Sequence, residues 1–450
     1  MGAAPQLTQG LSQRQLTMIA IGGVIGAGFF VGSGVVIRTA GPAAFLTYVL
    51  CGVLIILVMR MLGEMATANP STGSFADYAR DALGGWAGFS VGWLYWYYWV
   101  IVVGFEAVAG AKVFNYWVKA PIWLVALILM LTMTATNLFS VSSFGEFEFW
   151  FAGIKVATII IFLVLATLFV LGLWPGRHLD FSNLTAHGGF FPHGVGGMFA
   201  AVVVVIFSMV GAEVATIAAG ETANPERAIA KATNAVAARI AIFFVGSVFL
   251  LVVLLPWNAV EVGASPFVAA LKHIGIRGAD HIMNAIVLTA VLSCLNSGLY
   301  TGSRMLFVLA ARGEAPARLL KVSRRGVPYL AIVGSSVVGF LCVIMSAIAP
   351  GSVFTFLLNS SGAIVLFVYL LIALSQIVLR YKTPPEKLRV KMWFFPVLSI
   401  LTLLAIVGVL VQMAFNSTVR VQFWLSLLSW AMVVVVYFLA KRWRRPVAGA

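Results

Sequence analysis

Charged residues and cysteines are both scarce in this sequence. Only 10% of its 450 residues are charged, whereas a typical soluble domain carries about 25%. Its three cysteines, Cys51, Cys294 and Cys342, lie in apolar stretches without the short spacings of metal sites or disulfide frameworks. The polar positions within those stretches form no histidine or cysteine cluster suited to catalysis. These absences exclude a soluble enzyme and a disulfide-rich secreted module, and they argue against a membrane enzyme.

Long apolar runs account for most of the chain. Hydrophobic residues make up 62% of it, and the mean hydropathy is +1.03. A helix needs roughly 20 apolar residues to cross a bilayer, and about twelve such runs occur here. We therefore predict an all-α polytopic membrane protein with 12 transmembrane helices in a single domain over residues 1–450. The spans are expected at residues 16–37, 43–65, 86–114, 122–139, 150–173, 195–220, 236–257, 282–311, 329–348, 353–379, 394–415 and 421–440.

The net charge of +15 is explained by topology. With the N-terminus inside, 21 basic residues fall on inner segments and 7 on outer ones, which is the asymmetry of the positive-inside rule. No basic cluster interleaved with aromatic residues lies outside the membrane, so no nucleic-acid partner is expected. The pattern predicts a multi-pass protein of the cell inner membrane with cytoplasmic N- and C-termini.

Glycine is concentrated in the first predicted span. Gly26 and Gly28 follow Gly22 and Gly23 closely, and glycine is costly inside a helix. The cluster predicts an unwound segment, which at membrane depth must be buried in protein or line a wet cavity. Close helix packing is the alternative, because Gly22 and Gly26 fit the small-xxx-small pattern of helix contacts.

The sixth predicted span carries a similar interruption at Gly211 and Glu213. Gly28 and Gly211 are 183 residues apart, and five spans separate equivalent points. An odd number of spans inverts the second unit relative to the first. Interrupted segments at matching places in two inverted halves indicate a transport site near the bilayer midplane.

Breaks of this kind offer free backbone groups to a ligand. Half-helix N-termini present N–H groups to an anion, and half-helix C-termini present carbonyls to a cation. A small zwitterion fits both ends of such a site. The hypothesis requires that the helices around Phe29 and Met209 are interrupted and face each other.

Three charged residues, Glu106, Lys155 and Glu213, interrupt apolar runs. A charge at membrane depth costs about 2.5–3.5 kcal/mol, so such residues usually pair or line a pathway. Lys155 is a candidate for proton coupling, with snorkelling to the interface as the alternative. Glu213 is a candidate for proton exchange or, equally, for bonding the N–H groups freed at the break.

Polar and aromatic patches occupy other spans. Ser293 and Ser297 share one helix face, and Asn359 begins another polar patch; these residues either contact a substrate or join helices by hydrogen bonds. The aromatic run from Trp93 to Trp99 covers every helix face. Most of it is expected in the interfacial belt or in packing, with inner members walling the substrate chamber.

The motifs resemble those of the bacterial amino acid transporter family, within the amino acid–polyamine–organocation superfamily. Besides the two interrupted spans and the intramembrane lysine, the resemblance is carried by residues 62–65, 73–75, 145–150, 232–234 and 303–306. Four stretches are also similar to those of γ-aminobutyrate (GABA) permeases, namely residues 92–96, 215–219, 293–297 and 359–364.

The resemblance implies a leucine-transporter-like fold with a 5+5 inverted repeat and two more helices. The repeats would cover residues 16–173 and 195–379, and the additional helices residues 394–440. Relatives bind the substrate carboxylate at the first break and the ammonium at carbonyls of the second. The implied substrate-binding residues here are Val24, Gly26, Ala27, Gly28, Glu106, Phe207, Ser208, Val210, Gly211, Ser293 and Asn359. Lys155 matches a lysine that replaces sodium in proton-driven relatives, and Ala27 departs from a hydroxyl residue found in some of them.

These expectations describe a secondary active transporter without a cofactor. The ATP-binding sequence Gly-x-x-x-x-Gly-Lys-Ser/Thr is absent, so an ion gradient or exchange must supply the energy. The resemblance implies import of GABA or a closely related amino acid with protons, coupled through Lys155, Glu106 and Glu213. The alternative is a permease or exchanger for an aromatic or other neutral amino acid. A channel fits the interrupted, inverted organisation less well.

Overall fold

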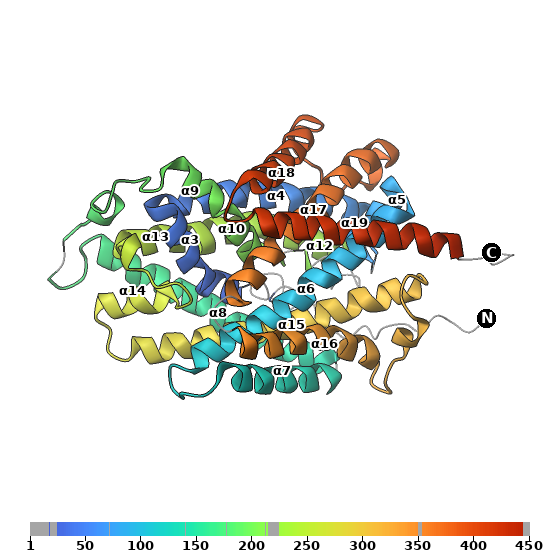
Figure 1. Ribbon diagram of the computed structural model, residues 1–450. Helices are drawn as coiled ribbons and strands as arrows, with labels where there is room; N and C mark the ends of the chain where they lie inside the picture. Colours follow the sequence, from blue (N-terminus) through green and yellow to red (C-terminus); the bar gives the residue numbers. More distant parts are fainter. Residues whose placement is uncertain are drawn as a thin grey trace.

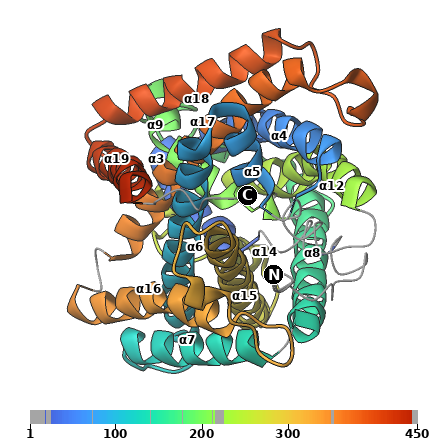
Figure 2. The same ribbon diagram turned by 90° about the vertical axis from the view of Figure 1, so that its right-hand side faces the viewer.

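The computed structural model describes residue 18 and residues 25–71, 73–139, 141–176, 178–211, 213–214, 225–349 and 353–443. Within these ranges the chain is helical between its loops and contains no strand. Figures 1 and 2 show the long helices packed as one bundle, with segments far apart in the sequence lying side by side.

The helices follow one another with short connections. The long and interrupted helices of the first part are α2 (Ala27–Phe30), α3 (Gly32–Ala40), α4 (Ala44–Ala68), α5 (Ser74–Leu83), α6 (Gly85–Phe114), α7 (Ile122–Phe139) and α8 (Val141–Val170). They continue with α9 (Gly194–Ala200), α10 (Val202–Met209), α12 (Pro225–Arg239), η3 (Ile240–Gly246), α13 (Ser247–Leu254), α14 (Pro266–Ile274), α15 (Ala279–Ala311), α16 (Tyr329–Ile348), α17 (Val353–Lys382), α18 (Val397–Phe415) and α19 (Arg420–Trp443).

Ten helical stretches in the described ranges are long and apolar enough to cross a membrane. One of them, Ala27–Ala68, includes the end of the first predicted span and the whole of the second, and the shorter apolar stretch Gly194–Met209 lies in the sixth. The predicted all-helical membrane architecture is therefore confirmed. One boundary was predicted late, because α8 begins at Val141 rather than at residue 150.

Helices α6 and α15 form the centre of the bundle and pack against each other along their length (Figure 1). Of the most apolar stretch of α6, 83% is buried, against 11% for α19. Figure 2 places α18 and α19 at the edge of the bundle. Their outward side chains, such as Leu404 and Leu428, are exposed and apolar, which is the surface that a bilayer covers.

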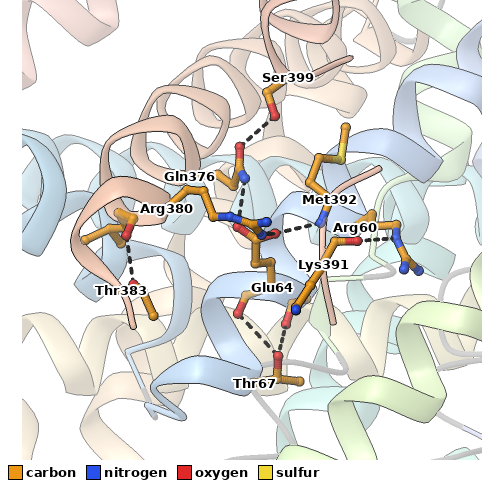
Figure 3. A network of polar contacts seen from close by, with 11 residues as sticks. Arg60, Glu64, Thr67, Gln376, Arg380, Thr383, Lys391, Met392 and Ser399 are labelled. Carbon is orange, nitrogen blue, oxygen red and sulfur yellow. Dashed lines mark hydrogen bonds and ion pairs between the residues drawn. The ribbon is translucent and has the colours of Figure 1, made fainter. Parts of the chain in front are cut away.

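A buried carboxylate joins α4 to the last part of the chain (Figure 3). Glu64 accepts hydrogen bonds from Gln376 Nε2 at 2.8 Å and from the backbone nitrogen of Met392 at 2.6 Å. It also forms an ion pair with Arg380. Gln376 Oε1 in turn accepts a hydrogen bond from Ser399 Oγ at 2.9 Å. One side chain thus connects α4, α17, α18 and the segment that precedes α18.

Candidate substrate and coupling site

The first span is interrupted at Gly26. Gly26 has an extended backbone (φ −128°, ψ −154°) and precedes the short helix α2. The N–H groups of Phe29 and Phe30 donate to the Gly26 carbonyl at 3.2 and 3.1 Å. The Ala27 N–H starts the helix and donates to the Glu106 carboxylate, with nitrogen-to-oxygen distances of 3.1 and 3.2 Å. The sequence-predicted break is confirmed on this side, while Val24 lies outside the described residues.

The sixth span is interrupted directly after Met209, where α10 ends. Val210 is extended (φ −63°, ψ 149°), and Gly211 has a φ of +112°. Such a backbone suits glycine, because a Cβ atom is strained there. The Gly211 N–H donates to Glu213 Oε2 at 3.0 Å. Tyr95 Oη donates to the other oxygen of Glu213 at 3.3 Å, so this carboxylate makes the contacts of the structural alternative.

The two breaks face each other. Helix α2 packs against α10, and a Cβ atom added at Gly28 would lie 2.8 Å from Phe207 Cε1 and 3.3 Å from Ser208 Cα. Phe29 is fully buried. The adjacency of the Phe29 and Met209 regions, which the hypothesis of a shared site requires, is therefore present in the fold.

A small cavity lies between the breaks. Its volume is about 10 Å³, which is room for about one water molecule. The cavity is lined by Gly26, Gly28, Tyr98, Trp99, Val102, Glu106, Phe207, Ser208, Val210 and Cys294. The site is thus closed around a space smaller than an amino acid, and substrate entry requires it to widen.

The cavity contains most, but not all, of the predicted binding residues. Gly211 forms the break without lining the cavity, and Ser293 points into a different cluster. The side chain of Asn359 lies outside the described residues, although its backbone belongs to α17. Sequence reasoning missed Val102 and Cys294. Val102 lies four residues before Glu106, so the helical period could have placed the two on one face.

Lys155 is buried within α8 and does not reach the interface. Its side chain is fully buried, and Nζ donates to Ser293 Oγ on α15 at 2.8 Å. Ser293 Oγ donates to Glu148 Oε1 at 2.6 Å, and Lys155 Nζ lies 3.7 Å from the same oxygen. The snorkelling alternative is therefore wrong. Glu148 was not among the predicted site residues, although it lies seven residues before Lys155 on the same helix face.

The described residues contain no group of three or more histidine, cysteine, aspartate or glutamate side chains arranged to hold a metal ion. The only acidic group in the cavity lining is Glu106. The site therefore presents backbone polar groups, one carboxylate and aromatic walls to a ligand.

Comparison with known proteins gives the family. The amino acid permease family model matches residues 15–448. The chain is 53% identical over 441 residues to the gamma-aminobutyric acid permease of Bacillus subtilis, covering 97% of this chain and 94% of that protein. It is 44% identical over 448 residues to the gamma-aminobutyric acid permease of Escherichia coli, covering 98% and 96%. An aromatic amino acid transport protein of Corynebacterium glutamicum is 39% identical over 439 residues, with 96% and 95% covered.

A solved structure supports the fold. The manganese transporter of Eremococcus coleocola superimposes with a TM-score of 0.56 at 11% identity, covering 96% of this chain and 93% of that one. At this identity the likeness concerns the fold alone, which is leucine-transporter-like. Together with the apolar helices, the relatives establish a multi-pass membrane protein related to transporters of amino acids. The chain belongs to the amino acid permease family, within the amino acid–polyamine–organocation superfamily.

Proposed function

We propose that this protein is a secondary active transporter that imports GABA, or a closely related amino acid, together with a proton by alternating access. The observation that carries the proposal is the pair of facing helix breaks, at Gly26 and Val210, around one cavity beside Glu106. The similarity to gamma-aminobutyric acid permeases over nearly the whole chain supports the choice of substrate. The inverted repeats over 16–173 and 195–379, with extra helices over 394–440, belong to the same proposal.

Substrate binding would use both breaks. The carboxylate would bind the N–H groups of Gly26, Ala27 and Gly28, and the ammonium would bind the carbonyls of Phe207 and Val210. The Ala27 N–H already donates to Glu106, so an entering carboxylate must replace that of Glu106. Once displaced, the Glu106 carboxylate is free to pair with the substrate ammonium, because both groups then face the same cavity.

Proton coupling is assigned to Lys155. Its ammonium lies on α8 and bonds to α15, which is where a positive charge can substitute for a bound cation. A zwitterion carried with one proton moves one net charge, and 100 mV supplies about 2.3 kcal/mol per charge. At about 1.4 kcal/mol per tenfold, this supports roughly 50-fold accumulation before a pH gradient is added.

Purified protein in proteoliposomes tests the proposal. Labelled GABA should accumulate when the lumen is alkaline and negative, and it should not accumulate when both gradients are collapsed. The Lys155→Ala variant should lose accumulation more than it loses GABA binding. Failure of the wild-type protein to accumulate GABA under either gradient would end the proposal.

An aromatic or other neutral amino acid is the second candidate substrate. The identity with the aromatic amino acid transport protein favours it, whereas the small cavity walled by Tyr98, Trp99 and Phe207 favours a small substrate. Unlabelled phenylalanine and GABA, each added in excess to the same uptake assay, distinguish the two. Stronger inhibition by phenylalanine would assign the protein to the aromatic group.

A further inference from the structure

Glu148 and Lys155 form a buried pair that the substrate cavity does not include. Both side chains are fully buried on α8, and the seven residues between them correspond to about two helical turns on one face. The distance of 3.7 Å between Lys155 Nζ and Glu148 Oε1 is too long for a direct hydrogen bond. A third group therefore determines how the two interact.

Ser293 on α15 supplies that group. Its hydroxyl accepts from Lys155 Nζ at 2.8 Å and donates to Glu148 Oε1 at 2.6 Å. A serine hydroxyl has a single hydrogen, and an ionised glutamate can only accept, so the chain of bonds has one direction. Hydrogen atoms point from Lys155 through Ser293 to Glu148.

We propose that Glu148 is the group that receives the coupling proton from Lys155. In this step an N–H bond of the Lys155 ammonium breaks and its proton bonds to Ser293 Oγ. The O–H bond of Ser293 breaks at the same time, and that proton bonds to Glu148 Oε1. Neutral Lys155, intact Ser293 and protonated Glu148 result, so atoms and charge balance without a co-reactant. The inference rests on the proposed function, because it assumes that Lys155 carries the transported proton.

Electrostatics favours such a transfer within the pair. An isolated buried charge is costly, but transfer from Lys155 to Glu148 changes an ion pair into two neutral groups and leaves the net charge of the pair at zero. The proton can thus leave Lys155 without creating an unpaired charge. Cys294, the residue after Ser293, lines the substrate cavity with Glu106, so the pair adjoins the substrate site.

The position of Glu148 gives the transfer a direction. It lies nearer the beginning of α8 than Lys155 by about 10 Å along the helix axis. In the predicted topology the beginning of α8 is on the cytoplasmic side. Glu148 Oε2 has no hydrogen-bond partner among the described residues, so this second oxygen is available to water when the inner side opens. Glu148 would then release the proton toward the cytoplasm.

Two assays in proteoliposomes test the role of Glu148. Accumulation of labelled GABA under an imposed proton gradient requires proton release, whereas counterflow at equal pH exchanges one loaded carrier for another and does not. For Glu148→Gln we expect accumulation to fall at least about tenfold while counterflow is retained. Glu146→Gln is the matched control, since Glu146 is exposed in the same turn of α8, and it should behave as wild type in both assays.

Ser293 variants provide a second measurement that does not depend on the folding of Glu148→Gln. Ser293→Ala removes the bridge and leaves both charged groups in place, so accumulation should fall more than counterflow. Ser293→Thr keeps a hydroxyl and should restore accumulation. Equal losses in both assays, or wild-type accumulation by Glu148→Gln, would overturn the inference.

The controls separate this inference from the proposed function. A wild-type protein that does not accumulate GABA refutes the transport proposal itself. A wild-type protein that accumulates GABA, with Lys155→Ala inactive in accumulation and Glu148→Gln fully active, refutes only the role of Glu148.

Discussion

Glu106 Oε2 lies 3.1 Å from the backbone nitrogen of Ala27, a residue 79 positions earlier in the chain. The contact connects the middle of α6 to the start of α2 and fills a place where the proposed substrate carboxylate would bind. The closed site is therefore held by a carboxylate of the protein itself. A substrate that brings its own carboxylate exchanges one anion for another at the same N–H group.

The Glu106→Gln variant tests this exchange. A glutamine cannot form an ion pair with the substrate ammonium, and a hydrogen bond to a charged group contributes about 1.5–3 kcal/mol. We expect GABA to bind at least about tenfold more weakly. Butyrate, which has the same chain and carboxylate but no ammonium, should bind no more weakly than to wild type. Competition binding to detergent-purified protein measures both, and an equal loss for the two ligands would contradict the role.

The closeness of three helices at Gly26 gives the second prediction. A Cβ atom there would lie 2.5 Å from Glu106 Oε1 and 2.6 Å from Cys294 Cβ. Overpacking of this kind costs about 1–3 kcal/mol, and it acts at the substrate site. Gly26→Ala should therefore lose GABA binding and lower the thermal unfolding midpoint. Gly302→Ala is the control, because its nearest neighbour would lie 3.6 Å from the added Cβ; binding by both variants alike would refute the packing argument.

The buried carboxylate of Glu64 gives a prediction about stability. Removing one partner of a buried ion pair costs about 3–5 kcal/mol, and Arg380 is 20% exposed, which favours the lower end. We expect Glu64→Gln to lower the free energy of unfolding by about 3 kcal/mol. Denaturant unfolding of purified protein measures the change. Glu386→Gln, at an exposed position before α18, should change it by less than about 0.5 kcal/mol.

The sequence was most informative where a residue is unfavourable in its surroundings. Glycines at Gly26 and Gly211 predicted both helix breaks because they are costly within helices, and Lys155 was noticeable because a charge is rare at membrane depth. Glu148 was missed because the span was expected to begin at residue 150, which placed this glutamate outside the membrane. The apolar neighbours Phe147 and Phe149 gave no sign of the true start at Val141.

Contacts between distant segments could not be predicted at all. Glu64 and Arg380 are separated by 316 residues, and Lys155 and Ser293 by 138. Neither the hydrophobic pattern nor the charge pattern specifies which face of one helix meets which face of another. Ser293 was for this reason assigned to the substrate, whereas in the fold it joins two charged groups beside the cavity.

The last prediction separates the two roles considered for Glu213. Its carboxylate accepts the N–H of Gly211 at 3.0 Å and the hydroxyl of Tyr95 at 3.3 Å, and a glutamine oxygen can accept both bonds. If Glu213 holds the break, Glu213→Gln should retain gradient-driven GABA accumulation within about threefold. Glu213→Leu leaves a buried N–H group unpaired, which costs about 1–3 kcal/mol, and should weaken GABA binding by about tenfold. Loss of accumulation with intact counterflow in Glu213→Gln would instead assign Glu213 to proton exchange, because only the titratable group distinguishes that variant from wild type.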